Sequence, residues 1–156
     1  MTMQPAGRIT EALQAKLESL EKHLETPVVP GEQFAWLRAA DTALMEVGLA
    51  LRTQIARAHP QQFAEIETED AELIRRVEQL QAEDREITES FRELQTEVEQ
   101  LAQQADRIAP DEGPLENKVS RFADRALALV IQVRKQEQAI DTWTHEAFNR
   151  DRGVAD

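Results

Sequence analysis

Cysteine and tyrosine are absent from this chain of 156 residues, and aromatic residues make up only 4% of it. Without cysteine the chain can form no disulfide, no thiolate metal site and no thiol nucleophile. The low content of aromatic and β-branched residues argues against a β-sandwich or a β-barrel. Only five glycines and six prolines are present. These shortages leave an all-α fold as the expected class.

Basic residues are also few, because 18 Lys and Arg face 30 Asp and Glu, which gives a net charge of −12. Non-specific binding to nucleic acid requires a basic face, so we expect no nucleic-acid partner. No apolar run approaches the roughly 20 residues that a membrane span needs. The first eight residues, MTMQPAGR, lack the apolar core of a signal peptide. We therefore expect a cytoplasmic protein that does not bind membranes.

Prolines and glycines are concentrated at three places: Pro27–Gly31, His59–Pro60 and Pro110–Pro114. Proline has no N–H group and clashes with the preceding helical turn, so these places predict helix ends, and Pro60 should stop the second helix. The segments between them are rich in good helix formers. Four helices are predicted in one domain covering 1–156, at about 8–25, 32–58, 69–108 and 114–149.

Apolar residues recur at spacings of three and four along each segment, which is the pattern of an amphipathic helix. In the third segment the stripe runs from Leu73 to Ile108, and in the fourth from Leu115 to Ala147. The inner face of the second helix is predicted at Phe34, Leu37, Leu44, Leu51 and Ile55. Four such helices predict an antiparallel up-down-up-down four-helix bundle. The alternative is a long coiled coil that pairs two copies of the third helix.

Two of these stripes are interrupted by a polar residue, Asp84 in the third helix and Gln136 in the fourth. Both lie roughly 32–36 Å from the predicted turn near Pro110, so they should share one level of the bundle. Gln54, at the end of the second helix, should lie within a turn or two of Asp84. Such a polar core layer is a ligand or metal site, a hydrogen-bonded layer that fixes register, or a loosely packed region that water reaches.

The three histidines, His23, His59 and His145, are all predicted to lie off the core stripes. No Glu-x-x-His pair exists, which excludes the di-iron carboxylate pattern. A weak surface zinc site where His59 and His145 meet stays an alternative. No serine has the context of a nucleophile, and no phosphate-binding loop or dinucleotide fingerprint occurs. The sequence therefore predicts no catalytic residue, no cofactor and no enzymatic activity.

The closing stretch Trp143–Gly153, WTHEAFNRDRG, resembles the C-terminal end of bacterial hemerythrin-like proteins. The segment Arg75–Glu86, RRVEQLQAEDRE, is similar to their third helix, and Trp36-Leu37 fits the start of their second. The resemblance extends over nearly the whole chain. It implies an antiparallel four-helix bundle, which in that family holds a non-haem di-iron centre through histidines and carboxylates.

Carried over position by position, the resemblance removes the metal ligands. The family's third-helix histidine falls on Asp84, and its last-helix His-x-x-x-Glu pair falls on Gln136 and Ile140. Its second-helix histidine falls near Gln54, with the following glutamate on Ala58. An aliphatic side chain such as that of Ile140 cannot coordinate iron. The resemblance thus implies that Gln54, Asp84 and Gln136 form a residual polar core layer at a lost metal site.

The expected function is that of a metal-free, non-enzymatic interaction or regulatory protein. One alternative is a protein that binds a small molecule or a metal in the polar core layer. A more remote alternative is a working di-iron oxygen-binding protein. The sequence is compatible with a protein partner that it does not name, and with a monomer or a weak homodimer.

Overall fold

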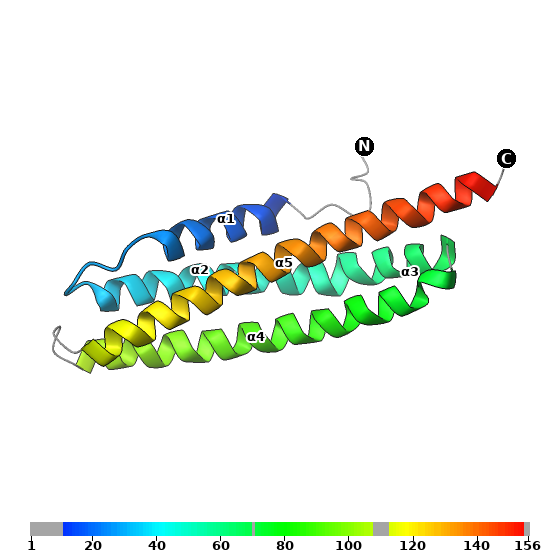
Figure 1. Ribbon diagram of the computed structural model, residues 1–156. Coiled ribbons are helices and arrows are strands. Elements are labelled where there is room, and N and C mark those ends of the chain that lie inside the picture. Colours follow the sequence, from blue (N-terminus) through cyan, green and yellow to red (C-terminus); the bar gives the residue numbers. More distant parts are fainter. Residues whose placement is uncertain (1–10, 70, 108–112, 155–156) are drawn as a thin grey trace.

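The computed structural model describes residues 11–69, 71–107 and 113–154, and these residues form helices and short connections without any strand. Figure 1 shows the helices as long rods lying side by side. The elements in chain order are α1 (Glu11–Glu25), α2 (Gln33–Thr53), a π-helical turn (Gln54–Ala58), α3 (His59–Glu69), a 3₁₀ turn (Ala71–Leu73), α4 (Ile74–Arg107) and α5 (Gly113–Val154). The all-α expectation is confirmed.

The rods pack through the apolar stripes that the sequence predicts. α2 lies against α1 and α4, and α5 lies against α1, α3 and α4 (Figure 1). Helix α5 has 42 residues, so it is about 63 Å long. Within the described residues, no helix combines the length and the apolar character needed to cross a bilayer.

Buried apolar side chains form two separate clusters along the rods. The first apolar cluster combines α1, α2, most of α4 and the first half of α5, and includes Leu17, Leu44, Phe91 and Phe122. The second apolar cluster is smaller and combines α3, the 3₁₀ turn, the start of α4 and the last part of α5. Its buried members are Phe63, Ile66, Leu73, Val77, Leu80, Ile140 and Ala147. The four leucines that α1 buries all belong to the first apolar cluster.

The prediction that Pro60 ends the second helix is wrong, because the rod continues through α3 to Glu69. The turn before Pro60 is π-helical, and the N–H of His59 donates to the carbonyl oxygen of Gln54, five residues earlier. Proline disrupts a regular α-helix because it lacks a donor and its ring meets the carbonyl four residues back. The wider turn takes in one additional residue, and the chain continues as a helix beyond the proline.

The other helix ends differ from the predictions by a few residues. The third rod becomes α-helical at Ile74 after a 3₁₀ turn, not at Glu69, and α5 extends to Val154, beyond the predicted end at Asn149. The predicted start of the first helix at 8 and the predicted end of the third at 108 lie outside the described residues.

Phe34 was expected on the inner face of the second helix, but its side chain is 42% exposed. Trp36 takes the inner position in this first turn of α2, and its Nε1 donates to the carbonyl oxygen of Thr26 at 3.0 Å. Two residues are about 200° apart around a helix, so Phe34 points outward when Trp36 points inward. Leu37, Leu44 and Leu51 are buried as predicted.

Deleting Ala56 tests the role of the π-helical turn. The deletion should convert it into an α-helical turn and rotate the whole of α3 by about 100°. Since this rotation takes His59, Phe63 and Ile66 out of the core, we expect a loss of at least about 3 kcal/mol in unfolding free energy, measured by urea denaturation. The control Ala56→Gly keeps the chain length and should cost no more than about 1 kcal/mol. Equal stability of the deletion variant and the control would contradict the assignment.

Candidate functional site

Six polar side chains are buried at the level where the two apolar clusters meet. We call this group the buried polar cluster, and its members are Gln54, His59, Gln62, Asp84, Gln136 and Glu137. On α4, Asp84 lies between Leu80 of the second apolar cluster and Ile87 of the first. The same order holds on α5, where Gln136 and Glu137 lie between Val133 and Ile140. The polar groups therefore divide the core across three rods.

His59 lies at the centre of the buried polar cluster, and its side chain is fully buried. Its Nδ1 lies 2.9 Å and 2.8 Å from the two carboxylate oxygens of Asp84. Its Nε2 lies 2.5 Å from Oε1 of Glu137. A ring with both nitrogens protonated donates to both carboxylates at once, so the geometry is that of an imidazolium held between two acids.

The electrostatics favour the same charged form of the ring. Burial by itself lowers the pKa of His59, but the hydrogen bonds to Asp84 and Glu137 and the charges of these two acids raise it more strongly. The net result is a pKa raised from 6.5 to about 9. His59 is thus a cation at neutral pH.

Two glutamine amides extend the network around the carboxylates. Nε2 of Gln136 donates to Oδ1 of Asp84 at 2.6 Å and to the carbonyl oxygen of Leu80 at 3.1 Å. Nε2 of Gln54 donates to Oε2 of Glu137 at 3.2 Å. The three residues predicted from the sequence as a polar core layer, Gln54, Asp84 and Gln136, therefore lie in one hydrogen-bonded network, with Gln136 directly on Asp84.

The sequence analysis placed His59 outside the core, and the structure corrects this. Counting forward from Leu51 in steps of four and three gives Ile55 and Ala58 as inner positions. Counting back four residues from the buried Phe63 gives His59 instead. The two counts differ by one residue because the π-helical turn inserts one residue between them. This mismatch, next to a proline, is the signal that could have identified His59.

Glu137 was also missed, because it lies beside the stripe residue Gln136. Helix α5 buries a face wider than one stripe, since Leu129 and Val130 are both buried seven residues, or two helical turns, before Gln136 and Glu137. A second stripe therefore runs through Val130, Val133 and Glu137 at spacings of three and four. An acid on this second stripe is the sequence signal for a partner of His59.

The residues present do not fit the di-iron centre that the resemblance implies. Both nitrogens of His59 already face carboxylates on opposite sides of the ring. Ile140, at a ligand position of the family, is fully buried in the second apolar cluster. Across the part of the chain that the structure describes, no group of three His, Asp or Glu side chains is arranged to hold a metal ion. The alternative of a surface zinc site formed by His59 and His145 is wrong, because His59 is buried while His145 is exposed.

Three acceptors in the buried polar cluster have no donor among the described residues. They are the Oε1 atoms of Gln54, Gln62 and Gln136. An unsatisfied buried acceptor costs about 1–3 kcal/mol. A further group that donates a hydrogen bond could bind to these oxygens.

Open cavities lie elsewhere on the molecule. One is a groove of about 650 Å³ between α4 and α5, and another of about 340 Å³ lies between the α1–α2 connection and α5. A smaller one of about 100 Å³ lies between α2 and α4. None of the three is lined by a member of the buried polar cluster.

Comparisons of the chain with protein-family models, with curated proteins and with solved structures gave no match.

The raised pKa of His59 predicts that the protein loses stability in alkaline solution. The pKa in the folded state, about 9, lies above the value of 6.5 without the fold. The stabilisation is therefore complete below about pH 6.5 and is lost as the pH rises through about 9. Urea denaturation between about pH 6 and pH 10 should show a loss of about 3 kcal/mol from this group.

Two variants assign this pH dependence to His59. His59→Gln should be less stable than the wild type at pH 6. Its unfolding free energy should change much less between pH 6 and pH 10 than that of the wild type. His145→Gln removes an exposed histidine and should behave as the wild type. An unchanged pH profile in His59→Gln would show that other groups produce the effect.

Proposed function

We propose that this protein is a non-enzymatic helical bundle of the cytoplasm that acts through its surface, as an interaction or regulatory protein. The observation that carries the proposal is the closed state of the buried polar cluster. Both nitrogens of His59 and an oxygen of each carboxylate are engaged within the cluster. A catalytic centre, with or without a metal, needs a position open to substrate. The cavities that are open to solvent lie between helices at the surface instead.

In this proposal the buried polar cluster has a structural role, which is to fix the register of the helices. Apolar stripes tolerate sliding of one helix along another, whereas a buried polar contact is satisfied at one register only. His59, Asp84 and Glu137 come from α3, α4 and α5, so the cluster fixes the relative level of three rods. Removing one partner leaves an uncompensated buried charge, which typically costs about 3–5 kcal/mol.

We also propose that the four rods form an antiparallel up-down-up-down bundle. Contacts between rods that follow one another in the chain support this topology: α1 with α2, α2 with α4, and α4 with α5. The contact of the first rod with the last, α1 with α5, is what a closed four-rod arrangement requires. The kinship with hemerythrin-like proteins stays a prediction, and the meeting of Asp84 and Gln136 at one level is what supports it.

A second candidate function is binding of a small hydrogen-bond donor within the buried polar cluster. The three buried amide oxygens without a donor favour it. The two candidates differ in what a hydrocarbon replacement of the cluster does. If the cluster only fixes the register, hydrocarbon side chains can replace it without loss of function. If it binds a ligand, the same replacement abolishes the binding.

The first test concerns iron. Because both nitrogens of His59 are engaged and Ile140 occupies a ligand position, anaerobic addition of ferrous iron followed by air should give no oxo-bridged absorption. Elemental analysis of the native protein, together with its solution mass, should give less than one metal ion per chain. Two bound irons per chain would overturn the proposal in favour of a di-iron protein.

The second test is the triple variant His59→Leu, Asp84→Leu and Glu137→Leu. Its unfolding free energy should stay within about 2 kcal/mol of that of the wild type. The gain from replacing buried charges with hydrocarbon is offset because the amides of Gln54 and Gln136 lose their carboxylate acceptors. Asp84→Leu alone should be destabilised by about 3–5 kcal/mol, because it leaves the His59 cation with one partner. Proteins that co-purify with the wild type should also co-purify with the triple variant. Their loss from a folded triple variant would contradict a purely structural role of the buried polar cluster.

A further inference from the structure

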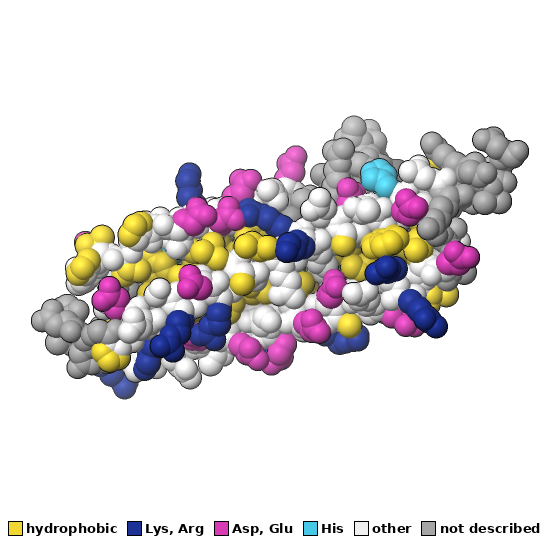
Figure 2. Space-filling view, viewed as in Figure 1, with side chains coloured by type: hydrophobic (Ala, Val, Ile, Leu, Met, Phe, Trp, Pro, Cys, Tyr) yellow, Lys and Arg dark blue, Asp and Glu magenta, His cyan; other side chains and the backbone are white. Residues whose placement is uncertain are grey.

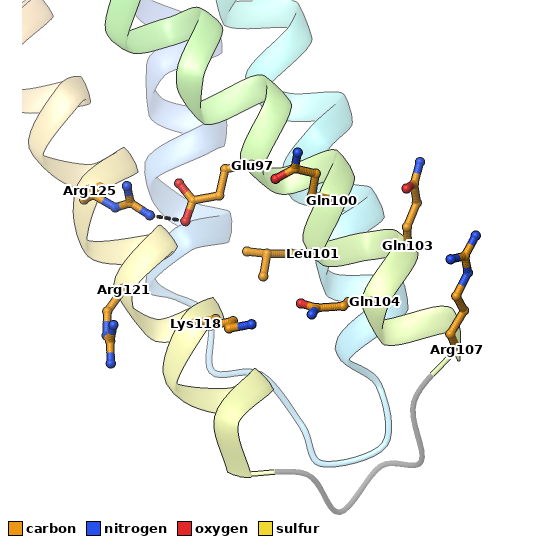
Figure 3. Close-up of a pocket in the computed structure, with 9 residues that line it drawn as sticks. All are labelled: Glu97, Gln100, Leu101, Gln103, Gln104, Arg107, Lys118, Arg121 and Arg125. Atoms are coloured by element: carbon orange, nitrogen blue, oxygen red, sulfur yellow. Dashed lines mark hydrogen bonds and ion pairs between the residues drawn. The ribbon is translucent and has the colours of Figure 1, made fainter.

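The groove between the end of α4 and the start of α5 differs in charge from the rest of this acidic protein. It has a volume of about 650 Å³ and is lined by Glu97, Gln100, Leu101, Gln103, Gln104, Arg107, Lys118, Arg121 and Arg125 (Figure 3). We call it the basic groove, because four cations and one carboxylate line it while the whole chain has a net charge of −12. Figure 2 shows Lys and Arg side chains gathered at this end of the molecule.

Cations enter the basic groove from one face of α5. Lys118, Arg121 and Arg125 follow one another at spacings of three and four residues, which places them on one side of the helix. From the first to the third the helix rises about 10 Å. In Figure 3, Lys118 and Arg125 are directed toward α4, whereas the side chain of Arg121 points away from α4 on the outer side of α5.

The charges of the basic groove are only partly neutralised from within. Arg125 forms an ion pair with Glu97 across the groove. In the described ranges, Lys118 and Arg121 have no ion-pair partner. Gln100 and Gln104 add side-chain amides to the opposite wall. Guanidinium, ammonium and amide groups together are the donors that bind phosphate oxygens.

The size of the groove restricts the kind of anion. Its volume falls within the range of about 300–1,000 Å³ that is typical of small-molecule sites. A long nucleic acid would extend past the groove onto surfaces of the same negative sign, which repel it. A row of cations about 10 Å long instead matches a short chain of linked phosphate groups.

We propose that the basic groove binds a small anion that carries two or more linked phosphate groups. Lys118 and Arg125 hold the phosphate groups inside the groove, and the amides of Gln100 and Gln104 donate from α4. Arg121 adds positive charge from the outer side of α5. Binding exchanges the Glu97–Arg125 pair for a phosphate contact. The inference goes beyond an interaction role and does not depend on the buried polar cluster.

The test uses the full chain and inorganic tripolyphosphate as the probe, with isothermal titration calorimetry at about 150 mM ionic strength. The wild type should bind one tripolyphosphate per chain with a Kd below about 1 mM, and single inorganic phosphate at least about tenfold more weakly. The double variant Lys118→Gln and Arg125→Gln should weaken tripolyphosphate binding at least about tenfold. No measurable binding to the wild type would overturn the proposal.

A matched control separates the groove from the overall charge. Arg75→Gln with Arg85→Gln makes the same change in charge at exposed positions of α4 far from the groove. This control should bind tripolyphosphate within about twofold of the wild type. An equal loss in the control and in the groove variant would show that only the general field attracts the anion. Tighter binding of an oligoglutamate peptide than of tripolyphosphate would overturn the phosphate assignment and indicate an acidic protein segment as the ligand.

Discussion

The buried contact of His59 with Asp84 and Glu137 is the interaction on which the arrangement of the rods depends. It joins α3, α4 and α5, and each of them supplies a charged group that would be strongly unfavourable in the core alone. The apolar clusters on either side supply most of the free energy of packing, but leucines and valines accept several registers. The charged group accepts one register, because His59 has only two nitrogens and each must face a carboxylate.

The sequence predicts the fold class and part of the buried polar cluster, and the reason lies in the regularity of α4 and α5. Their stripes repeat at four and three residues without a break, so Asp84 and Gln136 are visible as polar residues at apolar positions. In the second rod, no polar residue after Gln54 can be recognised in this way. Its π-helical turn shifts the inner face by one residue, and Pro60 indicates an end that the helix does not have. His59 is therefore hidden by a local change in helical pitch, which shows in the sequence only as a mismatch of one residue in the spacing of the inner positions beside Pro60.

Net charge is a mean over the chain, and the basic groove shows what such a mean omits. The sum of −12 argues against a long polyanion as a partner. It says nothing of a group of like charges that the fold assembles from two helices. Lys118, Arg121 and Arg125 form a visible series in the sequence, but the opposite wall from Gln100 to Arg107 joins them only through the packing of α4 on α5. Local charge at a groove is a property of the tertiary structure.

The division of the core has a consequence for how the molecule moves. The four leucines that α1 buries add to the first apolar cluster, while the second apolar cluster has seven buried members on α3, the 3₁₀ turn, α4 and α5. Unequal burial gives unequal opening free energies, and the boundary between such units falls where contacts change character. The buried polar cluster is that boundary. On these grounds the end that contains Phe63 and Ile66 should open at a lower free energy than the end that α1 covers.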